Sequence, residues 1–207
     1  MGFCMKHKLG LICLILTMIS FAVIIPIYSK WLYLIDLNFY DLDQAAGLSK
    51  QVISHNYDIL MQYLLNPFKE KLSMPDFPSS KDGLKHFHDV KLLFQLVQVV
   101  FLVTIVPSFL FLRRLKRQEQ LWRLINPMRF MMLLPIGLGF LMFLGFDTFF
   151  TKFHELFFSD STWIFYPEVD PIILVLPEEY FMHCFILGFA VLELLAFCFY
   201  WRGKRSL

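Results

Sequence analysis

Two histidines in different polar segments are the strongest candidates for acid–base chemistry in this chain. His86 lies just before an apolar run and His154 lies just after another. Imidazole is the side chain whose ordinary pKa is nearest to neutral, so a pair of imidazoles can take up and return protons. The types of these residues therefore indicate proton transfer, provided that the fold brings the two rings together.

The neighbours of each histidine sharpen this hypothesis. His86 and His88 point about 200° apart on a helix, because each residue turns the chain by about 100°, so at most one of them faces the interior. Asp89 follows His86 by three residues on nearly the same face, where a carboxylate can orient an imidazole. Aromatic residues surround the other histidine in sequence: Phe149, Phe150, Phe153, Phe157 and Phe158.

The elements that must position these residues are four long apolar runs. Each approaches the roughly 20 residues that a helix needs to cross a bilayer, and we expect spans at residues 9–33, 90–112, 130–149 and 181–201. The composition agrees, because 57% of the 207 residues are hydrophobic, only 17% are charged and 25 are Phe. The sequence therefore predicts an all-α integral membrane protein, a four-transmembrane-helix bundle forming a single membrane domain over residues 1–207.

The distribution of charge predicts the orientation of this bundle. One side holds a concentration of basic residues: Lys6, Lys8, Arg113, Arg114, Lys116, Arg117, Arg123, Arg129, Arg202, Lys204 and Arg205. The acid on that side is Glu119, whereas the opposite side holds most of the carboxylates. Positive flanks stay in the cytoplasm. We therefore expect both termini to be cytoplasmic and residues 34–89 and 150–180 to form a small extracellular cap. The net charge of +2 gives no indication of nucleic-acid binding.

The cap segments contain further patterns. Ser49 is a candidate N-cap, apolar residues then recur at helical spacing, and Asn66-Pro67 ends the pattern, so we expect an amphipathic helix at 50–65 lying along the membrane surface. The apolar stretches at 35–42 and 172–176 are short enough to form a β element within the cap. Histidines at the edge of such a cap also have a simpler interpretation, as interfacial residues that bind lipid headgroups.

Several motifs of the outer segments resemble the Lit family, the lipoprotein intramolecular transacylases of Gram-positive bacteria. The matching residues are His86-Phe87-His88-Asp89-Val90-Lys91, Phe153-His154-Glu155-Leu156-Phe157-Phe158, Trp163, Asp170-Pro171 and Leu176-Pro177-Glu178. The four-span layout with two outer segments is also similar. At residues 160–161 the chain has Asp160-Ser161 where the family tends to have Asn-Asp, and at 166–167 it has Tyr166-Pro167 where an acid usually precedes proline. The resemblance therefore carries no role for acids at positions 161 and 166.

The resemblance implies an acyl transfer within one substrate. Lit enzymes act on diacylated bacterial lipoproteins in the membrane and move the sn-2 acyl chain of the S-diacylglyceryl group to the α-amino group of the same N-terminal cysteine, giving the lyso form. It also implies that His86 and His154 are the catalytic pair at the extracellular face, one taking the proton of the amine and the other protonating the glycerol alkoxide. We expect substrate-binding or orienting roles for Asp89, Lys91, Phe153, Phe157, Phe158, Trp163 and Asp170. No cofactor and no metal is needed for this chemistry.

Two alternatives come from other function classes. Glu178-Glu179 followed by His183 is similar to the paired-glutamate motif of intramembrane proteases, which would make a metal-dependent protease. However, the arginine usual four residues after the second glutamate is replaced by His183 itself. The other alternative is a non-enzymatic lipid-binding membrane subunit, for which both histidines would be dispensable.

Overall fold

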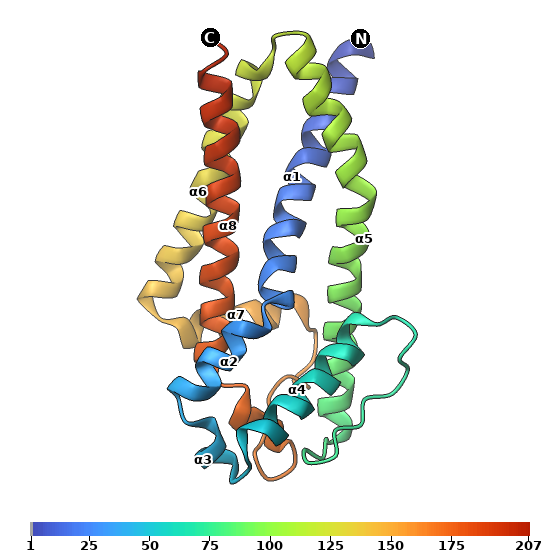
Figure 1. The fold of residues 1–207 in the computed structure, drawn as a ribbon, viewed down its shortest axis with the longest axis vertical. Coiled ribbons are helices and arrows are strands. Elements are labelled where there is room, and N and C mark those ends of the chain that lie inside the picture. Colours follow the sequence, from blue (N-terminus) through green and yellow to red (C-terminus); the bar gives the residue numbers. More distant parts are fainter. Residues whose placement is uncertain (1) are drawn as a thin grey trace. The chain divides into compact units, whose positions relative to one another are not determined.

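The computed structural model describes residues 2–207 of the chain, and its side chains from His7 onward. Within this part every regular element is a helix (Figure 1). The chain divides into two compact units. Unit 1 comprises residues 1–28, 97–144 and 185–207, and unit 2 comprises residues 29–96 and 145–184. The prediction of an all-α protein is confirmed.

Unit 1 contains long apolar helices. It is built from α1 (Gly2–Tyr28), the second part of α5 (Lys81–Arg117), η1 (Leu121–Leu124) leading into α6 (Ile125–Leu144), and most of α8 (Glu178–Lys204). In the described residues, four stretches are long and apolar enough to cross a membrane: His7–Tyr28, Lys81–Arg117, Leu121–Leu144 and Glu178–Lys204. Side chains such as Leu14, Met128 and Leu192 form the core between the helices, whereas Leu102 and Phe130 are exposed, as lipid-facing residues are. The prediction of a four-span membrane protein is confirmed.

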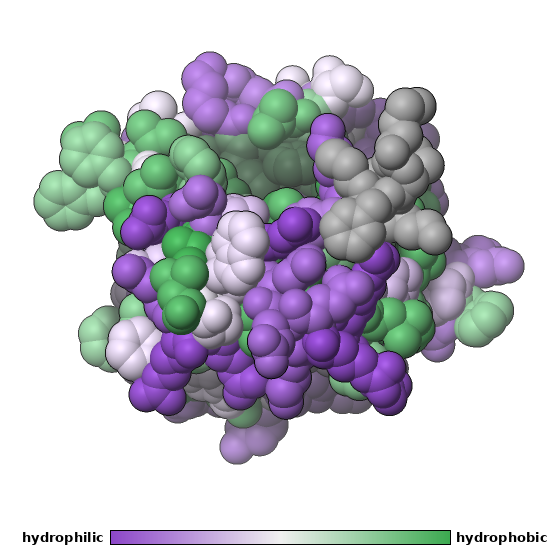
Figure 2. Space-filling model, turned by 90° about the horizontal axis from the view of Figure 1, so that it is seen from above, coloured by the Kyte–Doolittle hydropathy of each residue, from purple (hydrophilic) through white to green (hydrophobic). Residues whose placement is uncertain are grey.

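One end of unit 1 is hydrophilic. It gathers the start of α1, the end of α5, η1 and the end of α8, which carry the basic residues that flank the spans. Figure 2 looks onto this end and shows hydrophilic side chains collected there. Arg123 packs over the Trp122 ring and Arg205 over the Trp201 ring, at 5.5 and 5.0 Å from the ring centres.

Helix α5 is much longer than a bilayer requires. Its 37 residues extend over about 55 Å at about 1.5 Å per residue, against roughly 30 Å of hydrocarbon. Its first turns belong to unit 2. His86 therefore lies on a rigid helix, several turns before the part of α5 that belongs to the apolar bundle.

Unit 2 is made of short helices: α2 (Lys30–Phe39), α3 (Leu42–Ala46), α4 (Lys50–Leu65), the start of α5, α7 (Phe146–Phe157), η2 (Pro171–Val175) and the start of α8. The helix predicted at 50–65 is confirmed: the Ser49 hydroxyl accepts a hydrogen bond from the Val52 amide, and Asn66 caps the other end. Its apolar stripe, which includes Ile53 and Leu60, is buried inside unit 2. The expectation that this stripe lies on a membrane surface is therefore wrong.

The prediction of a β element in the cap is also wrong, because the described residues contain no strand. Residues 35–42 form the end of α2 and a turn into α3, and residues 172–176 lie in and just after the 3-10 helix η2. A short apolar run cannot distinguish a strand from a buried helical turn. At 35–42 the deciding residue is Asp36, which is buried on the same helical face as Leu32 and Leu37.

The structure places helix breaks inside two of the expected spans. The α1 helix ends at Tyr28 and α2 begins at Lys30, within the expected span 9–33. The α6 helix ends at Leu144, and Gly145 separates it from α7, within the expected span 130–149. Glycine lowers helix stability by about 1 kcal/mol relative to alanine, so a break at this position is physically reasonable. It places His154 on a separate short helix.

Candidate functional site

The start of α5 fixes the position of His86. The Ser80 hydroxyl accepts a hydrogen bond from the Gly83 amide at 2.9 Å, which caps the first turn. Asp170, from the loop before η2, accepts hydrogen bonds from the Ser80 amide at 2.8 Å and from its hydroxyl at 2.7 Å. His86 follows in the second turn with its side chain buried. The Asp170 carboxylate therefore anchors the segment of helix that presents this histidine.

The last turn of α7 presents His154 with a defined tautomer. Its Nδ1 lies 2.8 Å from the Phe150 carbonyl oxygen. A carbonyl oxygen only accepts, so Nδ1 carries the hydrogen and the neutral ring has its lone pair on Nε2. His154 is buried, and this burial lowers the pKa of its imidazole below the usual value, partly offset by the hydrogen bond to Phe150. His154 is therefore neutral at pH 7 and able to accept a proton at Nε2.

The two imidazoles lie side by side in unit 2. Their ring centres are 5.8 Å apart and the ring planes are inclined by 37°. The expectation that His86 lies near His154 while His88 points away agrees with this geometry, because the His88 side chain is 57% exposed. The Nδ1 atom of His86 is buried and has no hydrogen-bond partner among the described residues.

Aromatic rings enclose the pair. Trp163 stacks on His154 with ring centres 4.8 Å apart. Phe158 contacts both histidines, at 4.7 Å from His86 and 5.6 Å from His154. Phe165 meets His86 edge-on at 5.5 Å. The result is an apolar enclosure in which the polar atoms of the two imidazoles face little water.

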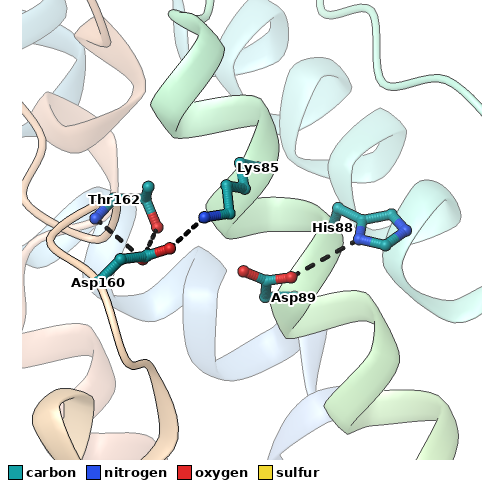
Figure 3. Close-up of polar contacts among 5 residues, drawn as sticks. All are labelled: Lys85, His88, Asp89, Asp160 and Thr162. Atoms are coloured by element: carbon teal, nitrogen blue, oxygen red, sulfur yellow. Dashed lines mark hydrogen bonds and ion pairs between the residues drawn. The ribbon is translucent and has the colours of Figure 1, made fainter.

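An ion pair fastens the loop that supplies these rings. Lys85, next to His86 on α5, donates a hydrogen bond to Asp160 (Figure 3). The other oxygen of Asp160 accepts hydrogen bonds from the Thr162 hydroxyl at 2.6 Å and from its amide at 3.3 Å. The Lys85 hydrogen bond first, and then those of Thr162, lower the pKa of Asp160 to about 2. Asp160 is therefore ionised at physiological pH, and the loop between Phe158 and Phe165 is tied to α5.

Three of the polar and charged residues expected at the site lie beside it instead. The Asp89 carboxylate faces His88, with 3.7 Å between the carboxylate oxygen and the imidazole Nδ1 (Figure 3), so the structure does not pair it with His86. Lys91 is buried, donates to the Lys69 carbonyl at 2.5 Å and lies 4.5 Å above the Tyr63 ring. Asp170 holds Ser80, as described above. Asp170 therefore holds the start of the helix that carries His86, and Lys91 binds the segment at Lys69 to the same helix.

The expected aromatic residues differ in their contacts. Phe158 and Trp163 contact the imidazoles directly, and Phe153 meets His154 edge-on at 5.7 Å. Phe157 packs on Phe153 at 4.8 Å and is half exposed. Phe165, in an irregular loop, was not expected from the sequence. Phe150 was expected among the aromatic residues around His154, and its backbone carbonyl also accepts the hydrogen bond from His154 Nδ1.

The described residues do not form the metal site that the paired-glutamate protease alternative requires. His183 lies with Nδ1 2.9 Å from an Asp36 oxygen, and Glu178 and Glu179 are exposed at the start of α8. Among the described side chains, from His7 onward, no group of three or more His, Cys, Asp and Glu is placed to hold one metal ion.

Comparisons with known proteins identify the family of this chain. The family model described as lipoprotein intramolecular transacylase Lit matches residues 8–181. The membrane-integral lipoprotein intramolecular transacylase Lit of Bacillus cereus superposes with a TM-score of 0.92 and 28% identity, over 100% of this chain and 97% of that one. Two further structures of that protein have one histidine replaced, and each matches with a TM-score of 0.82 and 28% identity. The match with the arginine variant covers 98% of this chain and 90% of that one. The match with the alanine variant covers 97% of this chain and 91% of that one. A comparison with curated proteins gave no match.

The family match covers most of the chain, and the structural likeness extends over all of it. The four apolar helices fit a protein that crosses the membrane several times. The chain therefore belongs to the Lit family and is a multi-pass membrane enzyme, a lipoprotein intramolecular transacylase.

Proposed function

We propose that this enzyme moves the sn-2 acyl chain of an S-diacylglyceryl group to the α-amino group of the same lipoprotein's N-terminal cysteine. The product is the lyso form, an N-acyl-S-monoacylglyceryl-cysteine. The observation that carries the proposal is the pair of buried imidazoles, His86 and His154, with ring centres 5.8 Å apart. Moving an acyl group from oxygen to nitrogen requires one proton to leave the amine and one to reach the alkoxide, which two adjacent imidazoles can supply.

The hydrogen bond at His154 suggests how the roles divide. With Nδ1 donating to Phe150, the free Nε2 of His154 is the base that takes a proton from the attacking amine. The nitrogen bonds to the ester carbonyl carbon, and the bond from that carbon to the sn-2 oxygen breaks. The proton taken up by His154 passes to His86, and His86 gives a proton to the departing alkoxide, so that both imidazoles end neutral. Each proton transfer contributes typically about 10²–10⁴-fold to the rate.

The enclosure around the histidines serves the same reaction in two ways. It holds an amine and an ester of one molecule together, and such proximity contributes at most about 7–11 kcal/mol. The rings of Trp163, Phe158 and Phe165 also exclude water, which favours attack by the amine over hydrolysis of the ester. Asp89, Lys91 and Asp170 support this arrangement as positioning residues, and Phe153 and Phe157 extend its aromatic wall.

The substrates that fit this proposal are diacylated bacterial lipoproteins held in the membrane by their acyl chains. The basic end of unit 1 is then cytoplasmic, together with both termini, and unit 2 with the histidines faces the outside of the cell. This is the side on which lipoproteins display their modified cysteine.

The test is expression in a bacterial strain whose lipoproteins are only diacylated, followed by mass spectrometry of one N-terminal lipopeptide. The lyso form has the same total mass as its precursor, so fragmentation must locate one acyl group on nitrogen. We expect His86→Ala and His154→Ala each to lower the rate by at least about a hundredfold.

His88→Ala is the matched control. His88 lies on the same helix turn as His86, but its side chain is 57% exposed and faces Asp89, so near-normal product is expected. Normal product from either His86→Ala or His154→Ala would contradict the catalytic assignment. Absence of the lyso form with the unmodified enzyme, in membranes that contain it at normal levels, would contradict the proposed reaction.

A further inference from the structure

Helix α2 is apolar on two opposite faces. Its inner face, with Leu32, Tyr33 and Leu37, is buried in unit 2. Its outer face is exposed and consists mostly of large apolar side chains: Trp31 (55% exposed), Leu34 (36%), Ile35 (54%) and Phe39 (75%). Positions 31, 34, 35, 38 and 39 form one stripe along a helix. A surface helix in water normally presents polar residues at these positions, so this stripe indicates a partner.

The inner contacts prevent this stripe from turning into the protein. The ring of Tyr33 stacks on Tyr57 with centres 3.8 Å apart and planes inclined by 7°. On the same face, the buried Asp36 carboxylate lies 2.9 Å from the His183 Nδ1 atom. Rotating α2 would break the stack and separate a buried carboxylate from its partner, which is costly. The outward direction of the stripe is therefore fixed by the fold.

The surface beside the stripe is hollowed in a way that suits an amphiphile. A shallow hollow of about 510 Å³ is lined by Leu34, Ile35, Asn38 and Phe39. A second hollow has a volume of about 380 Å³ and shares Leu34 and Asn38 with the first. Leu37 and polar residues of α4 complete its lining: Lys50, Gln51, Ser54, His55 and Asp58. An apolar hollow thus adjoins a polar one, as an acyl chain adjoins a headgroup.

Two further observations identify the occupant. The α2 helix begins after a single residue beyond α1, whose apolar length is sufficient to cross the membrane, and Trp31 is a residue type that concentrates at membrane interfaces. The cations near the polar hollow are matched by carboxylates, because Lys30 pairs with Asp58 at 2.6 Å and Lys50 lies 3.7 Å from Asp43 and 4.0 Å from Asp41. The surface therefore offers no excess positive charge to an anionic headgroup.

We propose that the outer face of α2 lies in the interfacial layer of the bilayer and holds an acyl chain of a neutral or zwitterionic lipid in its apolar hollow. The helix then acts as an interfacial anchor, a role that the buried stripe of α4 cannot fill. This inference is independent of the acyl-transfer chemistry, since it concerns a surface that carries neither His86 nor His154.

Spin-label accessibility in phosphatidylcholine vesicles tests the proposal with the full-length protein. Single labels are placed by Ile35→Cys and Phe39→Cys in a chain whose four native cysteines are alanine, and transacylase activity checks the fold. Phe68→Cys is the matched control, because Phe68 is an isolated apolar residue, 90% exposed, in the loop between α4 and α5. We expect the ratio of oxygen to water-soluble nickel-chelate collisions to be several-fold higher at 35 and 39 than at 68, and unchanged by adding anionic phosphatidylglycerol.

Equal nickel access at all three positions would overturn the proposal, and so would dipolar broadening at 35 and 39, which would show a second copy of the chain on this face. If the cysteine-free background fails to fold, a photoreactive benzoylphenylalanine at position 35 of the otherwise unchanged chain tests the same contact between α2 and lipid. Crosslinks to phosphatidylcholine support the proposal, whereas crosslinks to another copy, or no lipid adduct at a position that labels efficiently, contradict it.

Discussion

The two histidines differ in the hydrogen bonding of their Nδ1 atoms. His154 has its Nδ1 hydrogen donated to the Phe150 carbonyl, which leaves Nε2 as an acceptor. The buried Nδ1 of His86 has no partner among the described residues. A buried polar atom without a hydrogen bond costs about 1–3 kcal/mol. We therefore expect a polar atom of the substrate headgroup to form a hydrogen bond with this His86 nitrogen.

The burial of His154 predicts the pH dependence of the reaction. A general base must be neutral, and burial lowers the pKa of His154 below 6.5, so the neutral form persists as the pH falls through that value. Both the attacking amine and His154 must be neutral, so we expect kcat for a saturating lipopeptide to fall once as the pH drops below the amine's pKa near 8, and to fall more steeply only below pH 6.5, where His154 is protonated. A pH–rate profile measures both breaks. A second, steeper break at or above pH 6.5 would exclude a buried, neutral His154 as the base.

Removal of the Trp163 ring is expected to change the product. This ring stacks on His154 with ring centres 4.8 Å apart, and we expect it to keep water from the enclosure. In Trp163→Ala we expect part of the acyl groups to be released as free fatty acid, so that the lipopeptide loses the mass of one chain. Mass spectrometry and fatty-acid release measure this partition. Trp122→Ala in unit 1 is the control and should give the lyso form alone; unchanged product from Trp163→Ala would show that the ring does not exclude water.

At this scale the sequence identifies some residues of the site and misses others for physical reasons. His86 could be separated from His88 because a helix fixes the angle between them. Asp89 was expected to orient His86, but the structure places its carboxylate 3.7 Å from Nδ1 of the neighbouring His88. Phe165 and the Lys85–Asp160 pair come together through an irregular loop, and no periodicity in the sequence predicts which of its residues turn inward.

The elements around the site are held by the contact between the loop before η2 and the start of α5. Asp170 accepts two hydrogen bonds from Ser80, and Ser80 in turn caps Gly83. Gly83 lies so close to Asp170 that a Cβ atom at this position would collide with the carboxylate. The close approach explains why glycine occupies the first turn of this helix.

Gly83→Ala should therefore destabilise the protein, although alanine is normally the better helix former by about 1 kcal/mol. We expect a lower melting temperature in detergent and a lower kcat, because the start of α5 that carries His86 must shift. Gly137→Ala in α6 is the matched control, since a Cβ atom there meets nothing within 4 Å. A melting temperature that rises equally in both variants would contradict the proposed anchoring of α5 by Asp170.

Long elements were predictable and short ones were not. The four long helices and α4 follow from apolar length, helical spacing and the Ser49 cap, which are local properties. The strand expected at residues 35–42 failed because the helical state of α2 depends on partners distant in sequence, above all His183 for Asp36. The membrane-facing role expected for α4 failed for a similar reason, because unit 2 buries that stripe among its tyrosines.

At the scale of the whole molecule, the distribution of charged residues predicts which side of the membrane each end occupies. The basic residues lie at the ends of the spanning helices of unit 1, with Glu119 as the acid among those between residues 113 and 129. The polar segments of unit 2 carry most of the acids. Since basic flanks are retained in the cytoplasm, this asymmetry predicts cytoplasmic termini and a site that faces outward.

Two exposed positions test this orientation in intact cells. Leu207 is 83% exposed at the end of the chain and Phe68 is 90% exposed in unit 2. With native cysteines replaced, we expect Phe68→Cys to react with a membrane-impermeant maleimide in intact cells, and Leu207→Cys to react only after permeabilisation. The protein without added cysteine controls for background labelling. Reaction at Leu207→Cys before permeabilisation would place the basic end outside, and the histidines would then face away from the membrane side on which lipoproteins display their lipid-modified cysteine.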